Sequence, residues 1–222
     1  MKAPVVGIVV FPGSNCEGDV AEVLTGLGAQ VSFIWHTESD LSELDAVILP
    51  GGFAHGDYLR PGAIARFSPV MSELVSRADR GLPVVGICNG FQVLTETGLL
   101  PGALQKNANL SFLCEEAVLE VASVDSPLTL GLTLGTTVSL PINHFEGNYT
   151  CDAATLEGLQ EHERIILRYR SNPNGSMDSI AGICSAQRNV VGLMPHPERA
   201  ANTITGKTDG ISLFTSLLTT LR

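Results

Sequence analysis

Apolar residues along this chain form short runs that alternate with segments of helical periodicity. The run at 5–11, Val-Val-Gly-Ile-Val-Val-Phe, has no polar position, which is typical of a strand buried on both faces of a parallel sheet. In 17–27, apolar side chains recur at helical spacing up to Gly28, which predicts a helix. Further strands are predicted at 29–35, 45–50 and 84–87.

The segments between these runs continue the alternation of strands and helices. Residues 51–62 are rich in glycine and are predicted to form a loop. Helices are predicted over 63–80 and 89–97. Strands that alternate with helices are typical of an α/β fold with a doubly wound, mostly parallel sheet flanked by helices.

The second half of the chain changes character. Residues 111–141 contain short alternating apolar and polar positions, which predict a smaller antiparallel β section. More strands are expected at 164–170, 179–185 and 189–194, with a closing helix over 210–221. The sequence has no internal repeat, low-complexity linker or clear boundary, so we expect a single domain over 1–222.

Composition narrows the possible classes of protein. Hydrophobic residues make up 44% and charged residues 16%, which favours a large buried core over disorder. The net charge of −10, with 13 Lys and Arg, argues against a nucleic-acid partner. No apolar run reaches membrane-spanning length and the first residues lack a signal-peptide layout, so we expect a cytoplasmic protein with no membrane partner.

One of the five cysteines lies in a reactive context. Gly86-Ile87-Cys88-Asn89-Gly90 has the form glycine, any residue, nucleophile, any residue, glycine, placed between an apolar strand and a helix. Such a turn exposes the middle side chain, and the helix N-terminus favours a thiolate. We therefore predict that Cys88 is a nucleophile in a nucleophile elbow.

The remaining cysteines carry no such signal. The chain has an odd number of cysteines, five in all, and none of them forms a CxxC pair. Neither a metal site nor a disulfide framework is therefore expected. We interpret them as buried core residues: Cys16, Cys114, Cys151 and Cys184.

A general base is predicted at the end of the strand 189–194. Pro195 and Pro197 restrict the backbone around His196. If the segment is extended, residues two apart point the same way, so Glu198 can reach the His196 imidazole and hold its tautomer. Cys88, His196 and Glu198 are therefore the predicted catalytic residues.

A cysteine nucleophile also needs donors for the oxyanion of its tetrahedral intermediate. The backbone N–H of Asn89, directly after the nucleophile, is one predicted donor. The second is the N–H of Gly52, in a glycine loop that follows the strand 45–50. On local sequence alone, an ordinary strand-ending turn is an equally good interpretation of Gly52.

Gly206-Lys207-Thr208 has the ending of a phosphate-binding loop. The full motif requires glycine at position 201, which is alanine here, and no strand leads directly into it. An ATP site is therefore not expected in this chain, and any ATP-driven step is expected on another chain.

Together these motifs give the chain a family resemblance. Gly86-Ile-Cys-Asn-Gly-Phe-Gln92 and Pro195-His-Pro-Glu198 resemble class I glutamine amidotransferases. Three further segments resemble one branch of them, the glutaminase subunits of phosphoribosylformylglycinamidine synthase. These segments are 11–17, 51–66 and 172–183.

The resemblance implies a divided reaction. This chain would hydrolyse glutamine through a cysteinyl thioester, with Gln92 lining the substrate pocket and His144 near its mouth. A large synthetase chain would carry ATP and Mg and convert formylglycinamide ribonucleotide to its amidine in purine biosynthesis, beside a small bridging chain. No cofactor is implied here, and the isolated chain is expected to be a poor glutaminase. The family's usual His-Gly-Glu-Gly reads His144-Phe145-Glu146-Gly147, which alters this loop.

Other functions remain open at this point. The chain could be a glutaminase that serves a different ATP-dependent synthetase. It could also be a cysteine hydrolase or deglycase of related fold, although these typically lack His-Pro-Glu after the last strand. A purely structural or regulatory partner is disfavoured by the complete set Cys88, His196 and Glu198.

Overall fold

A mixed sheet runs through the middle of the molecule. The computed structural model describes residues 2–221, and within them the main sheet has nine strands in the order β2-β1-β3-β4-β11-β10-β9-β6-β7. The first five in this order are β2 (Gln30–Trp35), β1 (Val5–Val10), β3 (Ala46–Leu49), β4 (Val84–Ile87) and β11 (Val190–Leu193). The others are β10 (Ile180–Cys184), β9 (Ile165–Tyr169), β6 (Leu113–Val121) and β7 (Thr137–His144).

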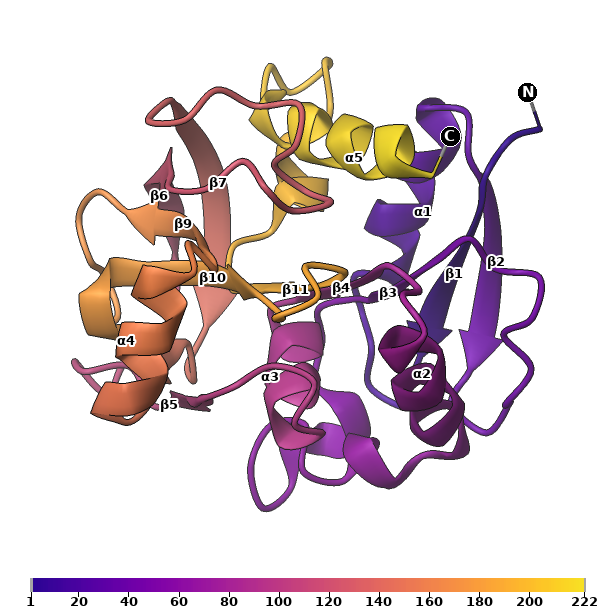
Figure 1. Ribbon diagram of the computed structural model, residues 1–222, viewed down its shortest axis with the longest axis horizontal. Coiled ribbons are helices and arrows are strands. Elements are labelled where there is room, and N and C mark those ends of the chain that lie inside the picture. The colour runs from indigo at the N-terminus through magenta and orange to yellow at the C-terminus, as the bar shows by residue number, and fades with distance from the viewer. Residues whose placement is uncertain (1, 222) are drawn as a thin grey trace.

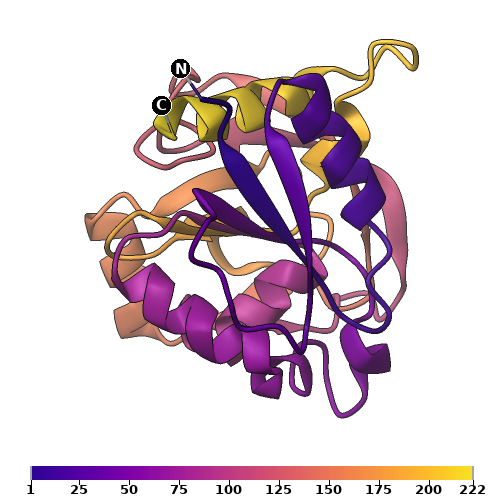
Figure 2. The same cartoon turned by 90° about the vertical axis from the view of Figure 1, so that its right-hand side faces the viewer.

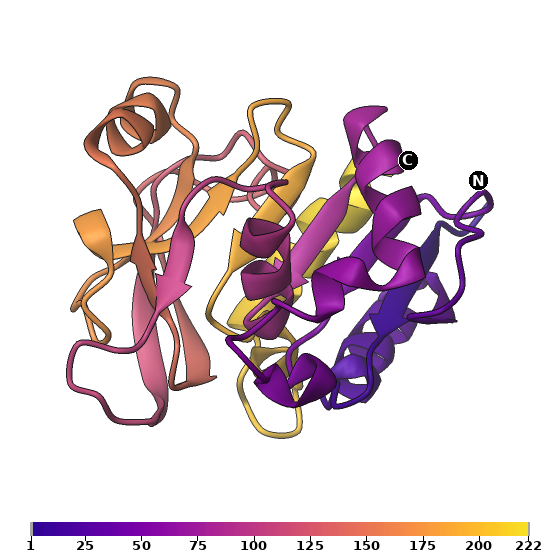
Figure 3. The ribbon, with the colours of Figure 1, turned by 90° about the horizontal axis from the view of Figure 1, so that it is seen from below.

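The sheet has a parallel section and an antiparallel section. Strands β2, β1, β3, β4 and β11 pair in parallel, and the pairs from β11 through β10, β9 and β6 to β7 are antiparallel. Seen from below, the two sections lie side by side (Figure 3). The predicted α/β sheet with an antiparallel section is therefore confirmed. Every residue of β3, β4 and β11 is buried, as their uninterrupted apolar runs indicate.

Helices cover both faces of the parallel section. Helices α1 (Glu17–Gly26) and α5 (Asp209–Thr220) lie on one face, and α2 (Pro69–Asp79) and α3 (Asn89–Glu96) lie on the other (Figures 1 and 2). Helix α3 contacts β3, β4 and β11 directly. This double cover is the reason that the central strands need no polar face.

Several predicted boundaries differ from the structure. The helix predicted over 63–80 begins only at Pro69, because proline suits the first helical position and disfavours helix in the residue before it. The preceding segment forms 3₁₀ turns, with positive φ at His55, Asp57 and Leu59. Within 111–141, residues 122–136 connect β6 and β7 instead of forming strands.

Three short elements have no counterpart in the predicted pattern. They are β5 (Ala103–Gln105), β8 (Asn148–Thr150) and α4 (Ala153–Glu161). Strands β5 and β8 form a separate antiparallel pair, which packs against α3 through β5. Among the helices of residues 2–221, none combines the length and the apolar character needed to cross a membrane.

The cysteines are distributed differently from the prediction. Cys16 and Cys184 are buried, as expected. The core interpretation is wrong for Cys114, which is exposed on β6, and for Cys151, which is only half-buried after β8. An antiparallel sheet can expose one face to solvent, so a small apolar residue in this section need not be in the core.

Candidate active site

Close packing explains the two glycines beside Cys88. A Cβ atom at Gly90 would overlap the carbonyl oxygen of Leu49 in β3, and one at Gly86 would crowd the Leu94 side chain in α3. Only glycine lets β4, the turn and α3 pass this close to the neighbouring strand. The turn holds Cys88 at φ 50° and ψ −104°, a strained conformation for an L-residue and the mark of a nucleophile elbow.

The pairing of β4 with β11 brings the predicted base to the nucleophile. Leu193 lies opposite Ile87 in the parallel register, and the Cys88 N–H donates to the Leu193 carbonyl at 2.8 Å. His196 follows three residues later, and its N–H donates to the carbonyl of Pro141 in β7 at 2.8 Å. The central ladder and β7 therefore fix both residues at the same end of the sheet.

His196 and Glu198 form a buried pair. The distance between His196 Nδ1 and Glu198 Oε1 is 2.6 Å, and both side chains are almost fully buried. The expected extended geometry is wrong, because Pro197–Ala200 forms a 3₁₀ turn in which Pro197 is the first residue. The turn, rather than the alternation of a strand, places the carboxylate against the imidazole.

The environment of His196 favours a charged imidazole. Burial alone lowers the pKa of His196, but the attraction of Glu198 and of the Cys88 sulfur raises this pKa well above its ordinary value. The Nδ1–H donates to Glu198, and the buried Nε2 has no hydrogen-bond partner within residues 2–221. The Cys88 thiol donates instead to the Asn143 carbonyl, with a sulfur–oxygen distance of 3.7 Å.

A second thiol lies beside this pair. Cys16 Sγ is 4.0 Å from His196 Nδ1 and accepts a hydrogen bond from Arg199 Nη2 at 3.1 Å. The ligand atoms of Cys16, His196 and Glu198 lie within 4.8 Å of one another, which is close enough to hold a metal ion. The Arg199 guanidinium on the sulfur opposes a cation there, so the arrangement is better suited to proton transfer than to metal binding.

Of the two predicted oxyanion donors, Gly52 lines this cavity and Asn89 directly follows Cys88 in the chain. Asn89 is the first residue of α3, where a backbone N–H has no partner inside the helix. The backbone hydrogen bonds that hold the loop of Gly52 are made by the residues on either side of it: Phe53 N–H donates to Gly13 O at 2.8 Å, and Gly51 O accepts from Asn15 N–H at 3.3 Å. A Cβ at Gly52 would meet the Ser14 backbone at 2.7 Å, so glycine is needed for this close approach.

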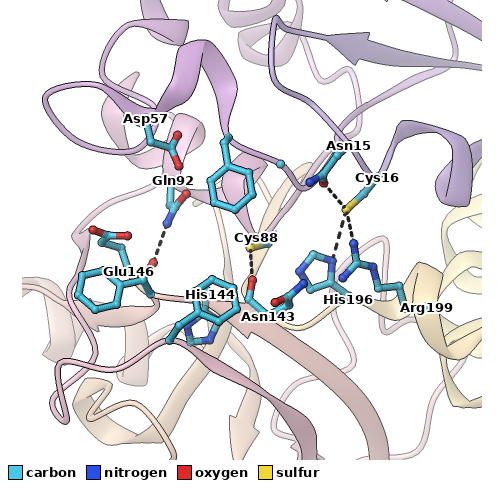
Figure 4. Close-up of a pocket in the computed structure, with 14 residues that line it drawn as sticks. Asn15, Cys16, Asp57, Cys88, Gln92, Asn143, His144, Glu146, His196 and Arg199 are labelled. Atoms are coloured by element: carbon cyan, nitrogen blue, oxygen red, sulfur yellow. Dashed lines mark hydrogen bonds between the residues drawn. The ribbon is translucent and has the colours of Figure 1, made fainter.

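The cavity has a volume of about 90 Å³, and its two sides differ in chemistry. Figure 4 shows His196, Cys16 and Arg199 on one side of Cys88, and Asp57, Gln92 and Glu146 on the other. Gln92 is buried there, and its amide donates to the Glu146 carbonyl at 2.6 Å. Burial and the charge of Glu146 outweigh a hydrogen bond from Asn89 and together raise the pKa of Asp57 to about 6.

The structure places His144 in the cavity wall as a neutral residue. Burial and, to a smaller extent, the charge of His196 together lower the pKa of His144 to about 4. The distance from Nδ1 to Asn107 Oδ1 is 3.1 Å, so the neutral ring can donate to this amide oxygen. Phe145 also lines the cavity, and its ring centroid lies 5.8 Å from Lys106 Nζ.

Some cavity residues were not singled out from the sequence. They are Asn15, Cys16, Phe53, Asp57, Phe112, Asn143 and Arg199. Cys16 lies inside segment 11–17 and Asp57 inside segment 51–66, both of which carry the family resemblance. This membership is the only feature of the sequence that indicates a role for Cys16 and Asp57 in the site. Asn143 lies near the end of β7 in the antiparallel section, so no local pattern around Cys88 indicates that it lines the cavity.

Comparison with known proteins gives a consistent set of relatives. A family model described as a CobB/CobQ-like glutamine amidotransferase domain matches residues 3–210. The phosphoribosylformylglycinamidine synthase subunit PurQ of Synechococcus sp. (strain JA-2-3B'a(2-13)) is 57% identical over 96% of this chain and 95% of the relative. The subunit of the same name from Koribacter versatilis is 51% identical over 96% of each chain.

The fold comparison agrees with the sequence comparison. A chain in the structure of PurLQS from Thermotoga maritima superposes with a TM-score of 0.92 at 39% identity, covering 100% of both chains. The chain therefore belongs to the CobB/CobQ-like glutamine amidotransferase domains and, among them, to the PurQ subunits of phosphoribosylformylglycinamidine synthase.

Proposed function

We propose that this chain is the glutaminase subunit of a phosphoribosylformylglycinamidine synthase and releases ammonia for a partner synthetase. The observation that carries the proposal is the elbow cysteine Cys88 in one cavity with the buried pair His196 and Glu198. In this proposal the synthetase converts formylglycinamide ribonucleotide to its amidine in purine biosynthesis, and a small bridging subunit completes the complex. We also propose that the complex works in the cytoplasm.

The geometry supports catalysis through a thioester. The Cys88 sulfur attacks the carboxamide carbon of glutamine, and the N–H groups of Asn89 and Gly52 hold the resulting oxyanion. His196 delivers a proton from Nε2 to the departing nitrogen, so that ammonia leaves and a thioester forms. His196 then takes a proton from water that attacks the thioester, and glutamate is released. Glu198 holds the Nδ1–H and stabilises the imidazolium throughout.

ATP and Mg belong to the partner chain in this proposal. Lys207 of the Gly206-Lys207-Thr208 segment forms an ion pair with Glu116 of β6. This segment lies in a loop after the 3₁₀ turn Pro197–Ala200 and leads into α5 rather than following a strand. These contacts support a structural role for Lys207.

Reconstitution with the synthetase tests the proposed function. In the complex, Cys88→Ser is expected to abolish amidine formation from glutamine while amidine formation from added ammonium salt continues, because only the sulfur chemistry is removed. Loss of both reactions would show that Cys88 is structural. A wild-type complex that uses ammonium but never glutamine would overturn the proposal.

Covalent labelling gives an independent check. A glutamine-like electrophile such as diazo-oxo-norleucine is expected to modify Cys88, as located by mass spectrometry. Cys114 is the internal comparison, because its thiol is exposed and simple access would favour it. Labelling at Cys114 in preference to Cys88 would contradict the assignment of the nucleophile.

The resting contacts support dependence on the partner. The Cys88 thiol bonds to the Asn143 carbonyl, and His196 Nε2 is unpaired within the described residues. We expect the free chain to release glutamate slowly and the complex to release it faster. Equal turnover with and without the synthetase would contradict this expectation.

A further inference from the structure

The substrate cavity contains two carboxylates that lack a cation. Asp57 lies in the loop after β3, and Glu146 lies in the loop between β7 and β8. Both are half-buried and line the cavity with Cys88. Within residues 2–221, neither carboxylate forms an ion pair with a Lys, Arg or His.

The cations nearest in sequence are used elsewhere. Arg60 and Arg66, from the same loop as Asp57, both pair with Glu96 at the end of α3, at 2.6 and 3.9 Å. Lys106 is exposed and attracts Glu146 without pairing with it. Two partly desolvated carboxylates without a cationic partner cost free energy, which a bound cation would recover.

The position of the base determines which end of glutamine can lie near these carboxylates. The carboxamide must meet Cys88, and His196 occupies the opposite side of the sulfur from Asp57 (Figure 4). The rest of the substrate must then extend along the free side, past Gln92. That end of glutamine carries the α-carboxylate and the α-ammonium group, and of these two only the ammonium group is attracted by Asp57 and Glu146.

We propose that the Asp57 carboxylate binds the α-ammonium group of glutamine and is the principal determinant of specificity for an α-amino acid amide, with Glu146 adding a weaker attraction. This inference rests on the proposed glutaminase function.

The hydrogen bonds of Asn89 hold Asp57 in position. Its amide nitrogen donates to Asp57 Oδ1 at 3.0 Å and to Gln92 Oε1 at 2.9 Å, and its amide oxygen accepts from Ala54 N–H at 3.0 Å. The residue that follows the nucleophile thus also orients the carboxylate. One residue links the oxyanion end of the cavity to the proposed ammonium end.

The test compares glutamine with glutaramate, which has hydrogen in place of the α-ammonium group. In the reconstituted complex, Asp57→Asn keeps an oxygen that accepts from Asn89 but removes the charge. We expect kcat/KM for ammonia release from glutamine to fall about 10- to 100-fold, mainly through KM, while that for glutaramate changes less than about twofold.

Two further variants give a smaller expected effect and a control for comparison with Asp57→Asn. Glu146→Gln is expected to lower kcat/KM for glutamine by less than Asp57→Asn, because Lys106 already offsets its charge. Glu157→Gln, an exposed change on α4, is expected to leave both substrates unaffected.

Each other outcome overturns the inference. Equal losses for both substrates would mean that Asp57 only positions Asn89, and no loss would mean that the ammonium group binds elsewhere. If the wild type releases too little ammonia from glutaramate, protection of Cys88 from alkylation by glutamate and by glutarate makes the same comparison. Asp57→Asn must then weaken protection by glutamate alone. A wild-type complex without activity on glutamine would instead contradict the proposed function.

Discussion

At the scale of single residues, the backbone of Cys88 is the most unusual feature of the site. Its φ of 50° is unfavourable for any residue with a Cβ atom, and it persists because β4, α3 and the neighbouring strand β3 hold the turn on all sides. The protein thus maintains a locally strained residue where its chemistry takes place.

The strain at Cys88 can be measured with a matched pair of variants. Cys88→Gly is expected to be more stable than Cys88→Ala by about 1 kcal/mol, because relief of strain exceeds the greater entropy of an unfolded glycine. Urea unfolding of both variants measures the difference. Both should be inactive, and an alanine variant more stable than the glycine variant would contradict the argument.

His144 predicts a specific pH dependence of stability. The pKa of His144 is about 4 in the folded protein rather than 6.5. Between pH 4 and pH 6.5, the unfolded chain therefore binds a proton at His144 that the folded protein does not bind. Stability is therefore present above pH 6.5 and is lost as the pH falls towards 4, by up to about 3 kcal/mol for this residue.

The slope of stability against pH is the quantity to compare. In urea unfolding between pH 6.5 and pH 4, His144→Gln is expected to reduce the loss of free energy of unfolding, whatever its effect at neutral pH. His162→Gln, the same change at an exposed histidine after α4, serves as the control. An unchanged slope in His144→Gln would show that His144 is not the group that resists protonation.

At the scale of elements, the elbow depends on close contact between α3 and β3. Gly90→Ala is expected to destabilise the fold by about 3 kcal/mol, because its new Cβ would overlap the Leu49 carbonyl, a backbone atom that cannot move alone. Gly26→Ala is the matched change in a helix with open space around it, and it is expected to stabilise by about 0.5 kcal/mol. Near-equal unfolding midpoints for the two variants would refute this packing argument.

Elements were predictable where one local signal decided the structure. Strands β3, β4 and β11 are buried on both faces, so their sequences are uninterrupted apolar runs. Strands β5 and β8 have three residues each and are held by their pairing and by α3, so periodicity carries no sign of them. The late start of α2 follows from Pro69, a signal that the apolar pattern of 63–80 obscured.

The same distinction applies to the site. Cys88 and His196 lie where glycines or prolines constrain the backbone, so the sequence marks them. The contact between Arg199 and Cys16 joins residues 183 positions apart and depends on how α1 and the last 3₁₀ turn meet. Asp57 reaches the cavity through a loop with positive φ angles, a path that spacing along the chain does not reveal.

At the scale of the whole molecule, the parallel section is expected to be the most stable region. Its central strands are buried on both sides by helices, whereas β5 and β8 form a small sheet of two short strands. Local opening requires less free energy where fewer buried contacts are lost. In native-state hydrogen exchange, amides of β4 and β11 should be among the slowest and those of β5 and β8 clearly faster. Equal protection in both regions would contradict this order.

The direct pairing of β4 with β11 has a consequence for how such a protein can change over evolutionary time. Cys88 and His196 are far apart in the sequence, yet one step of the sheet ladder separates the strands that carry them. Insertions, deletions and new surface loops in the antiparallel section away from β7, which holds His196 in place, can therefore accumulate without altering the spacing of the reactive pair, provided that β11 still pairs with β4. Those outer parts of the antiparallel section are then free to diverge and fit new surroundings, while the chemistry at the centre is inherited unchanged.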